Sequence, residues 1–219
     1  MFFSVFLEVI MQYRAIAELR PDRDVLRCLP DSVDAKRSLI AHQGALGIGA
    51  YDDGLFVGSL WFYRVEDPAS GCPLAPIWSG WHSDSDGFRR LSPEIPACAL
   101  PFLGLDCFHV GRTKALAARD VNDESYYRRG IGTGLLTAAL AWAAQRDYRS
   151  VIAGSGMDAF PAYNNWAGTL PLKVYLRNGF DVLKPGDARS AVPGHLRKAA
   201  EVIEQNRLDM ATMIRTIKR

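Results

Sequence analysis

The sequence predicts an α/β protein (an α+β arrangement of strands and helices), and three observations lead to this prediction. A glycine-rich segment opens a strongly apolar helix that lies between two short apolar strands. Two apolar runs joined by Asp-Gly predict a β-hairpin earlier in the chain. The chain has 219 residues, is 48% hydrophobic and contains no linker-like stretch, so one domain spanning residues 1–219 is expected.

The first half of the chain is expected to contain a strand, two short helices and the hairpin. Residues 13–19 alternate loosely between apolar and polar, which is typical of a strand. Residues 21–42 have helical character, with Pro30 separating two short pieces. The hairpin is predicted to comprise residues 45–51, the turn Asp52-Asp53-Gly54 and residues 55–63.

A long segment rich in Pro, Gly, Ser and Trp follows the hairpin. It spans residues 66–104, and segments of this length inside a compact domain are usually functional or disordered. We interpret it as a lid or a wall of the substrate site, whose aromatic and imidazole side chains are Trp78, Trp81, His82 and Phe88. The alternative is a surface loop without a function.

The second half of the chain alternates between strands and helices. The expected elements are a strand at 105–110, a short helix at 114–119, an apolar helix at 135–146, a strand at 150–154, a helix at 172–177 and a strand at 180–183. Asn178-Gly179 is a common left-handed stop for the helix at 172–177. A C-terminal helix is expected within residues 191–219, because apolar residues recur at helical spacing over 196–217.

The run Arg129-Gly130-Ile131-Gly132-Thr133-Gly134 is the most informative feature of the sequence. Three glycines in five residues would disrupt a helix interior, but they suit a loop that opens a helix. Such a loop leaves backbone N–H groups unpaired, with the positive end of the helix dipole behind them. This arrangement predicts an anion-binding site suited to phosphate.

The glycine spacing narrows the type of phosphate site. A P-loop requires a lysine after its last glycine, and a dinucleotide fingerprint requires Gly-x-Gly-x-x-Gly, and neither pattern is present. Arg129-x-x-Gly132-x-Gly134 resembles the pyrophosphate-binding motif of the GNAT superfamily of acyl-CoA-dependent N-acyltransferases. The segment from Tyr175 to Phe180 resembles the Tyr-x-x-x-Gly-Phe signature of the same superfamily.

The resemblance implies a mixed central β-sheet flanked by helices, with acetyl-CoA as cosubstrate. It implies that backbone amides of Phe108, His109 and Val110 bind the pantetheine arm and polarise the thioester carbonyl. It also implies that the pyrophosphate binds the amides of Arg129, Gly130, Ile131, Gly132, Thr133 and Gly134. Asn165, of the pair Asn164-Asn165, is a further candidate cofactor contact, although residues 168–171 lengthen its spacing to Tyr175.

Two side chains are candidates for proton transfer. Tyr175 occupies the position of the usual general acid of GNAT enzymes, and its alternative role is simple packing. His109 has an intrinsic pKa suited to a base, and its alternative role is structural. Cys107, which we expect on the same strand face as Leu105 and His109, is interpreted as a small buried residue because direct transfer needs no covalent step.

Composition limits the remaining classes of function. A net charge of +2 without a basic stripe gives no reason to propose a nucleic-acid partner. The four cysteines form no Cys-x-x-Cys pair and no metal-binding spacing with the histidines, so no metal site is expected. The apolar start of the chain lacks the features of a signal peptide and is too short to span a membrane. A cytoplasmic protein is therefore expected.

The sequence thus predicts an N-acetyltransferase that transfers acetyl directly from acetyl-CoA to a small-molecule or peptide amine. Two alternatives remain open: an inactive acyl-CoA-binding module and a nucleotide-binding α/β enzyme. The amine is not readable from the sequence, and a homodimer is neither required nor excluded.

Overall fold

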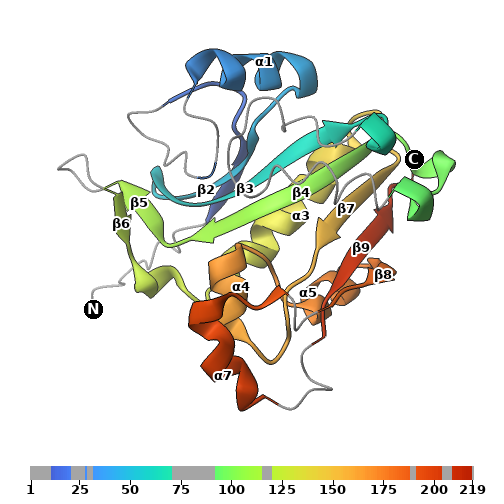
Figure 1. Cartoon of the computed structure of the whole chain (residues 1–219). Helices are drawn as coiled ribbons and strands as arrows, with labels where there is room; N and C mark the ends of the chain where they lie inside the picture. Colours follow the sequence, from blue (N-terminus) through green and yellow to red (C-terminus); the bar gives the residue numbers. More distant parts are fainter. Residues whose placement is uncertain are drawn as a thin grey trace, which may run out of the picture.

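The computed structural model describes residues 11–20, 28, 32–70, 92–114, 120–187, 191–203 and 209–218. Its centre is a seven-stranded sheet in the order β1-β2-β3-β4-β7-β9-β8 (Figure 1). Neighbouring strands are antiparallel except for β4 and β7, which are parallel, so the sheet is mixed as expected. The strands of this sheet are β1 (Gln12–Ala15), β2 (Gly47–Asp52), β3 (Leu55–Val65), β4 (Phe102–Val110), β7 (Ser150–Gly154), β8 (Asp181–Pro185) and β9 (Ala211–Thr216).

Helices cover both faces of the sheet. The longest, α3, packs the apolar side of its 14 residues against β1 to β4, and α1 lies on the opposite face (Figure 1). The described helices are α1 (Val33–Gln43), α3 (Ile131–Ala144), α4 (Pro161–Ala167), α5 (Leu172–Arg177) and α7 (Arg197–Glu201), with short 3-10 turns at Pro68–Ser70, Ser92–Glu94, Ala97–Ala99, Glu124–Tyr126 and Gly194–Leu196. None of the helices in the described ranges is both long and apolar enough to cross a membrane.

The hairpin β2–β3 is confirmed, and its turn has the expected chemistry. Asp53 and Gly54 both adopt positive φ, at 47° and 79°, as the tight turn between right-twisted strands requires. The strand at β7 and the helix α5 are also confirmed, and α5 ends at Asn178 with Gly179 in the left-handed region. Local sequence patterns therefore predicted the elements on both sides of the glycine loop.

Several expected elements differ in extent. The opening strand is shorter than expected, and only the second of the two expected N-terminal helices lies within the described residues, as α1. Residues 102–104 of the expected lid belong to β4, while Trp78, Trp81, His82 and Phe88 lie outside the described residues. Lys114, expected in a helix, lies in β5 (Arg112–Lys114), which pairs with β6 (Asp120–Asn122); residues 115–119 are not described.

The expected C-terminal helix is wrong over residues 211–216, which form strand β9. This strand fills the position between β7 and β8, and its Ala211 and Met213 are buried on one face. The spacing of Met210, Met213 and Ile214 fits a helix, but the sheet supplies pairing partners on both sides that a surface helix would not have. Upstream of β9, the described part of this tail contains the short helix α7 and the 3-10 turn before it.

This correction predicts that Met213→Ala destabilises the protein by about 2–5 kcal/mol, because it empties a fully buried site between two strands. Val202, on the same tail, is 85% exposed, so Val202→Ala is expected to change stability by less than about 0.5 kcal/mol. Urea denaturation of both variants measures the difference. A Met213→Ala protein as stable as Val202→Ala would contradict the packing of β9 in the sheet.

Candidate active site

An extra residue in β4 shapes the centre of the candidate site. Between Leu60 and Phe62, β3 advances by two residues, whereas β4 advances by three between Leu105 and Phe108. This β-bulge exchanges the faces of the strand, so Leu105 and Phe108 both pack with α3 while Cys107 packs on the opposite side. The expectation that Leu105 and Cys107 share a face is therefore wrong, because strict alternation does not continue through a bulge.

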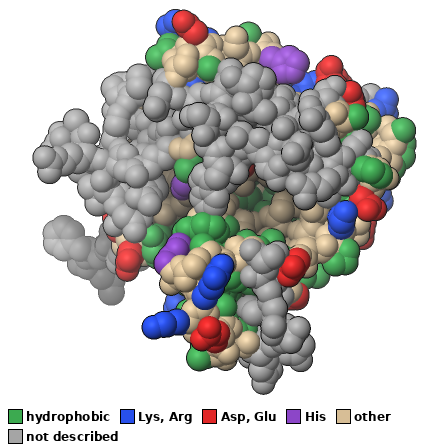
Figure 2. All heavy atoms as spheres, in the orientation of Figure 1, with side chains coloured by type: hydrophobic (Ala, Val, Ile, Leu, Met, Phe, Trp, Pro, Cys, Tyr) green, Lys and Arg blue, Asp and Glu red, His purple; other side chains and the backbone are tan. Residues whose placement is uncertain are grey.

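The two parallel strands diverge where the bulge begins. β4 pairs with β7 only from Phe102 to Leu105, opposite Ser150 to Ala153, and then continues to Val110 without β7 beside it. Backbone groups of β4 on this side therefore lose their sheet partners, which leaves an opening for another chain or a ligand. The space-filling view shows a hollow lined by apolar side chains near the middle of this face, with charged side chains gathered below it over α7 (Figure 2).

A short segment of the chain occupies this opening. Residues 168–171, which we call the strap, connect α4 to α5. The amide of Phe108 donates a hydrogen bond of 2.7 Å to the carbonyl of Gly168, and Thr169 Oγ1 donates one of 2.6 Å to the carbonyl of Gly154 at the end of β7. The strap therefore bridges both diverging strands.

The strap also reaches the two other parts of the candidate site. A Cβ on Gly132 would lie 2.8 Å from Leu170 Cδ2, so the Leu170 side chain rests on the glycine loop. Tyr175, fully buried at 1% exposure, forms hydrogen bonds with the Thr169 side chain and the Leu170 backbone. The strap thus brings together the glycine loop, the diverging strands and Tyr175.

The glycine loop has the predicted form. Gly130 is the N-cap of α3 with φ of 77°, and no side chain caps this helix end within the described residues. The first hydrogen bond of the helix runs from the amide of Gly134 to the carbonyl of Gly130, so the amides of Ile131, Gly132 and Thr133 precede the hydrogen-bonded ladder. Unpaired amides at the positive end of a helix dipole are the kind of donors that can bind an anion.

Arg129 is partly engaged away from this loop. Its guanidinium stacks on the Tyr126 ring at 5.1 Å and lies 3.7 Å from Asp52 Oδ2. The side chain is 47% exposed, so this ion pair contributes little to stability. Arg129 therefore contributes a positive charge at the edge of the glycine loop without being fixed there.

The expected amide contacts of β4 are not all available. The amide of Phe108 is bound by the strap, while His109 and Val110 lie partly exposed beyond the bulge. On α4, Asn164 is buried, and its side-chain amide pairs with both backbone groups of Met157 at 2.8 Å, so it holds the loop after β7. Asn165 is exposed on the same helix. The sequence analysis did not predict α4 itself.

Burial changes the acidity of Tyr175. Removal from water raises the pKa of the Tyr175 phenol above its ordinary value of 10.0, and the hydrogen bonds to the strap offset only part of this shift. The phenol is therefore neutral over the physiological pH range. Proton donation from it to a thiolate is further uphill than it would be from an exposed tyrosine.

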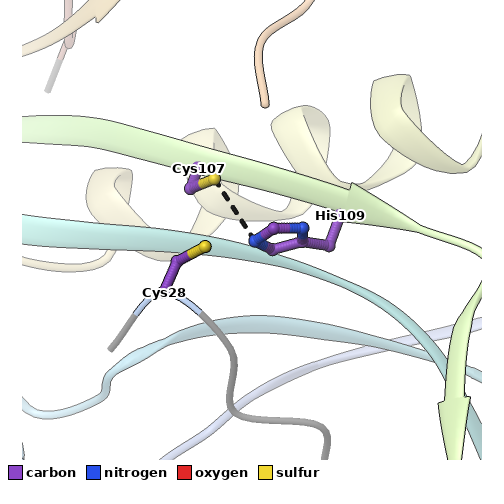
Figure 3. Close-up of side chains that lie close together, drawn as sticks. All are labelled: Cys28, Cys107 and His109. Atoms are coloured by element: carbon purple, nitrogen blue, oxygen red, sulfur yellow. Dashed lines mark hydrogen bonds between the residues drawn. The ribbon is translucent and has the colours of Figure 1, made fainter. Parts of the chain in front are cut away.

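Cys107 and His109 lie next to each other on β4, and Cys28 lies close to both (Figure 3). The distance between Cys107 Sγ and His109 Nε2 is 3.2 Å. The hydrogen bond with Cys28, burial and the nearby charges of Cys28 and Asp106 all raise the pKa of the Cys107 thiol. The sequence analysis missed the part played by Cys28, since 79 positions separate it from Cys107, but Cys-x-His on a strand is a local signal for the other two.

Comparison with solved structures identifies the fold. A mosquito arylalkylamine N-acetyltransferase-like protein (like 5b) is similar with a TM-score of 0.52 and 10% identity, covering 94% of this chain and all of that one. An agmatine N-acetyltransferase is similar with a TM-score of 0.50 and 13% identity, covering 84% of this chain and 81% of the other. No protein-family model and no curated protein matches the chain in sequence. The chain has the GNAT acyl-CoA N-acyltransferase fold.

Proposed function

We propose that this protein is an N-acetyltransferase that transfers acetyl directly from acetyl-CoA to an amine. The observation that carries the proposal is the divergence of β4 from β7 beside the uncapped start of α3. A thioester arm that enters the opening can meet backbone donors of β4, while its pyrophosphate meets the amides of Ile131, Gly132 and Thr133. The two similar structures, an arylalkylamine N-acetyltransferase-like protein and an agmatine N-acetyltransferase, support an amine acceptor.

The proposed reaction joins the amine nitrogen to the thioester carbonyl carbon and breaks the carbon–sulfur bond. The departing thiolate takes a proton from Tyr175, whose phenol is neutral at physiological pH. The proton lost by the amine passes to solvent or to Nδ1 of His109, because His109 Nε2 already contacts Cys107. The products are an N-acetyl amine and free CoA.

The strap must leave the opening before the thioester arm can bind there. Its carbonyl at Gly168 holds the Phe108 amide, which is the group that would otherwise meet the thioester side of the ligand. Leu170 covers Gly132 at the site proposed for pyrophosphate. The strap-closed structure is therefore proposed to be the resting state, and ligand affinity is reduced by the fraction of molecules in that state.

A covalent route through Cys107 is the competing chemistry, since its sulfur lies 3.2 Å from an imidazole nitrogen. The surroundings argue against it. The Cys28 thiol, burial and Asp106 raise the pKa of Cys107, so the reactive thiolate is scarce at neutral pH. Direct transfer remains the proposal, with Cys107 outside the reaction.

The proposal predicts that acetyl-CoA and a suitable amine release free thiol only in the presence of the enzyme. A thiol-release assay across arylalkylamines, diamines, guanidino amines and short peptides tests it, with calorimetry of CoA, ATP and NAD binding alongside. Binding of acetyl-CoA without thiol release on any amine would favour an inactive binding module. Tighter binding of ATP or NAD than of CoA would favour a nucleotide-binding enzyme.

A further inference from the structure

Two cysteines and a histidine from distant parts of the sequence converge on one side of β4 (Figure 3). Cys28 lies on a turn with φ of 59°, whereas Cys107 and His109 occupy alternate positions of β4, with Cys107 in the bulge and His109 after it. One potential ligand atom of each residue lies within 4.8 Å of the other two. The proposed acetyl transfer uses neither thiol.

We propose that Cys28 Sγ, Cys107 Sγ and His109 Nε2 bind a zinc ion. Two thiolates and an imidazole are the nitrogen and sulfur donors that zinc prefers, and the fourth tetrahedral position remains open. Bond lengths of about 2.3 Å to sulfur and about 2.0–2.1 Å to nitrogen place the ligand atoms of such a site roughly 3.5–3.8 Å apart. The observed 3.2 Å between Cys107 and His109 and the 4.8 Å limit for the group bracket this range.

The surroundings suit a cation that enters from solvent. Cys107 is buried, so its position is fixed by packing, whereas Cys28 is exposed and leaves a route for the ion. Asp106 directly precedes Cys107 in the chain, and its carboxylate interacts electrostatically with the Cys107 sulfur. This carboxylate adds negative potential at the site. A divalent cation would neutralise the two thiolates that would otherwise repel each other at this separation.

Zinc at this position would connect the N-terminal segment that carries Cys28 to the strand beside the strap. Zinc on His109 Nε2 would also keep the proton of the neutral imidazole on Nδ1, so that solvent would remain as the acceptor of the amine proton. The zinc site does not depend on the proposed acetyl transfer, because its ligands bind metal whether or not the protein is an enzyme.

Metal uptake by the reduced full-length protein tests the proposal. We expect about one zinc ion per chain after equilibration with Zn²⁺ and removal of excess metal, measured by elemental analysis. Cys28→Ala is expected to weaken zinc affinity roughly 100-fold in competition with a chromogenic chelator. Co²⁺ in place of zinc is expected to give thiolate-to-cobalt charge-transfer absorption that Cys28→Ala diminishes. Because Cys28 is exposed, this variant keeps the buried sulfur of Cys107.

Cys98→Ala is the matched control, since Cys98 is also an exposed cysteine. It is expected to bind zinc and cobalt like the wild type. Equal zinc affinity in the wild type and Cys28→Ala would overturn the proposal. A Cys28–Cys107 disulfide in protein handled without reductant, combined with no zinc uptake after reduction, would also overturn it and would indicate a redox pair.

Discussion

Replacing Tyr175 by phenylalanine is expected to lower kcat for acetyl transfer by roughly 10²–10⁴-fold, the usual contribution of a positioned proton donor. The change removes one oxygen from a ring that stays packed against Phe180 at a centroid distance of 5.2 Å, so the fold is preserved. Stability is expected to fall by only about 0.5–1.5 kcal/mol, because the hydroxyl loses its hydrogen bonds with the strap. Steady-state thiol release measures kcat, and calorimetry measures acetyl-CoA binding, which is expected to persist.

The pH profile gives this prediction a second readout. Because the pKa of Tyr175 is raised by burial, the phenol stays protonated well past neutral pH. Loss of its proton is therefore not expected to lower the rate until the pH exceeds the ordinary tyrosine value of about 10. If the rate declined from about pH 8 upward, and did so identically in Tyr175→Phe, the group responsible for the decline would not be Tyr175.

Tyr148→Phe is the matched control for the proton-donor role. Tyr148 is as buried as Tyr175, at 1% exposure, but it packs against Trp142 on the far end of α3. Removing its hydroxyl is expected to leave kcat within about threefold of the wild type, since the Tyr148 ring packs against Trp142 and Arg64. A Tyr175→Phe enzyme that retains wild-type kcat would refute the role of Tyr175 as the acid.

Local patterns in the sequence were sufficient for the elements that surround the glycine loop. The apolar stripe of α3, the Asp53-Gly54 turn and the left-handed stop at Gly179 are each determined by residues close together in the chain. The GNAT fold could be predicted because the two motifs that resemble those of the superfamily, at residues 129–134 and 175–180, both lie in this half of the chain. The unpaired amides at the start of α3 could be predicted from the glycine loop and the helix after it.

The features that depend on distant contacts were not predicted. Strand β9 exists because β7 and β8 leave a position between them, and the spacing of its own residues fits a helix equally well. The bulge in β4 is visible only against the register of β3. Likewise, residues 168–171 read as a spacer in the sequence, and only the divergence of β4 and β7 gives them a place to bind.

Gly168→Ala is expected to strengthen acetyl-CoA binding by roughly 10- to 100-fold, because it expels the strap from the opening between β4 and β7. Gly168 is buried with φ of 62°, a conformation that costs an alanine about 1–2 kcal/mol. A Cβ at this position would also collide with Cys107 Sγ. The backbone strain and the collision both destabilise the state in which the strap occupies the opening. Neither acts on a ligand-bound state in which the strap has left the opening. Calorimetric titration with acetyl-CoA measures the gain in affinity, and the thermal midpoint of the unliganded variant is expected to fall.

Gly54→Ala separates this effect from general backbone strain. Gly54 has a φ of 79° in the β2–β3 turn, and a Cβ there would have no atom within 4 Å, so the variant carries the strain without the collision. It is expected to lose stability but to bind acetyl-CoA with wild-type affinity, because the added Cβ touches neither the strap nor the glycine loop. A weaker affinity in Gly168→Ala alone would mean that residues 168–171 hold the ligand rather than exclude it. The sign of the change thus decides whether the strap blocks the opening or forms part of the site, since both roles fit the same closed structure.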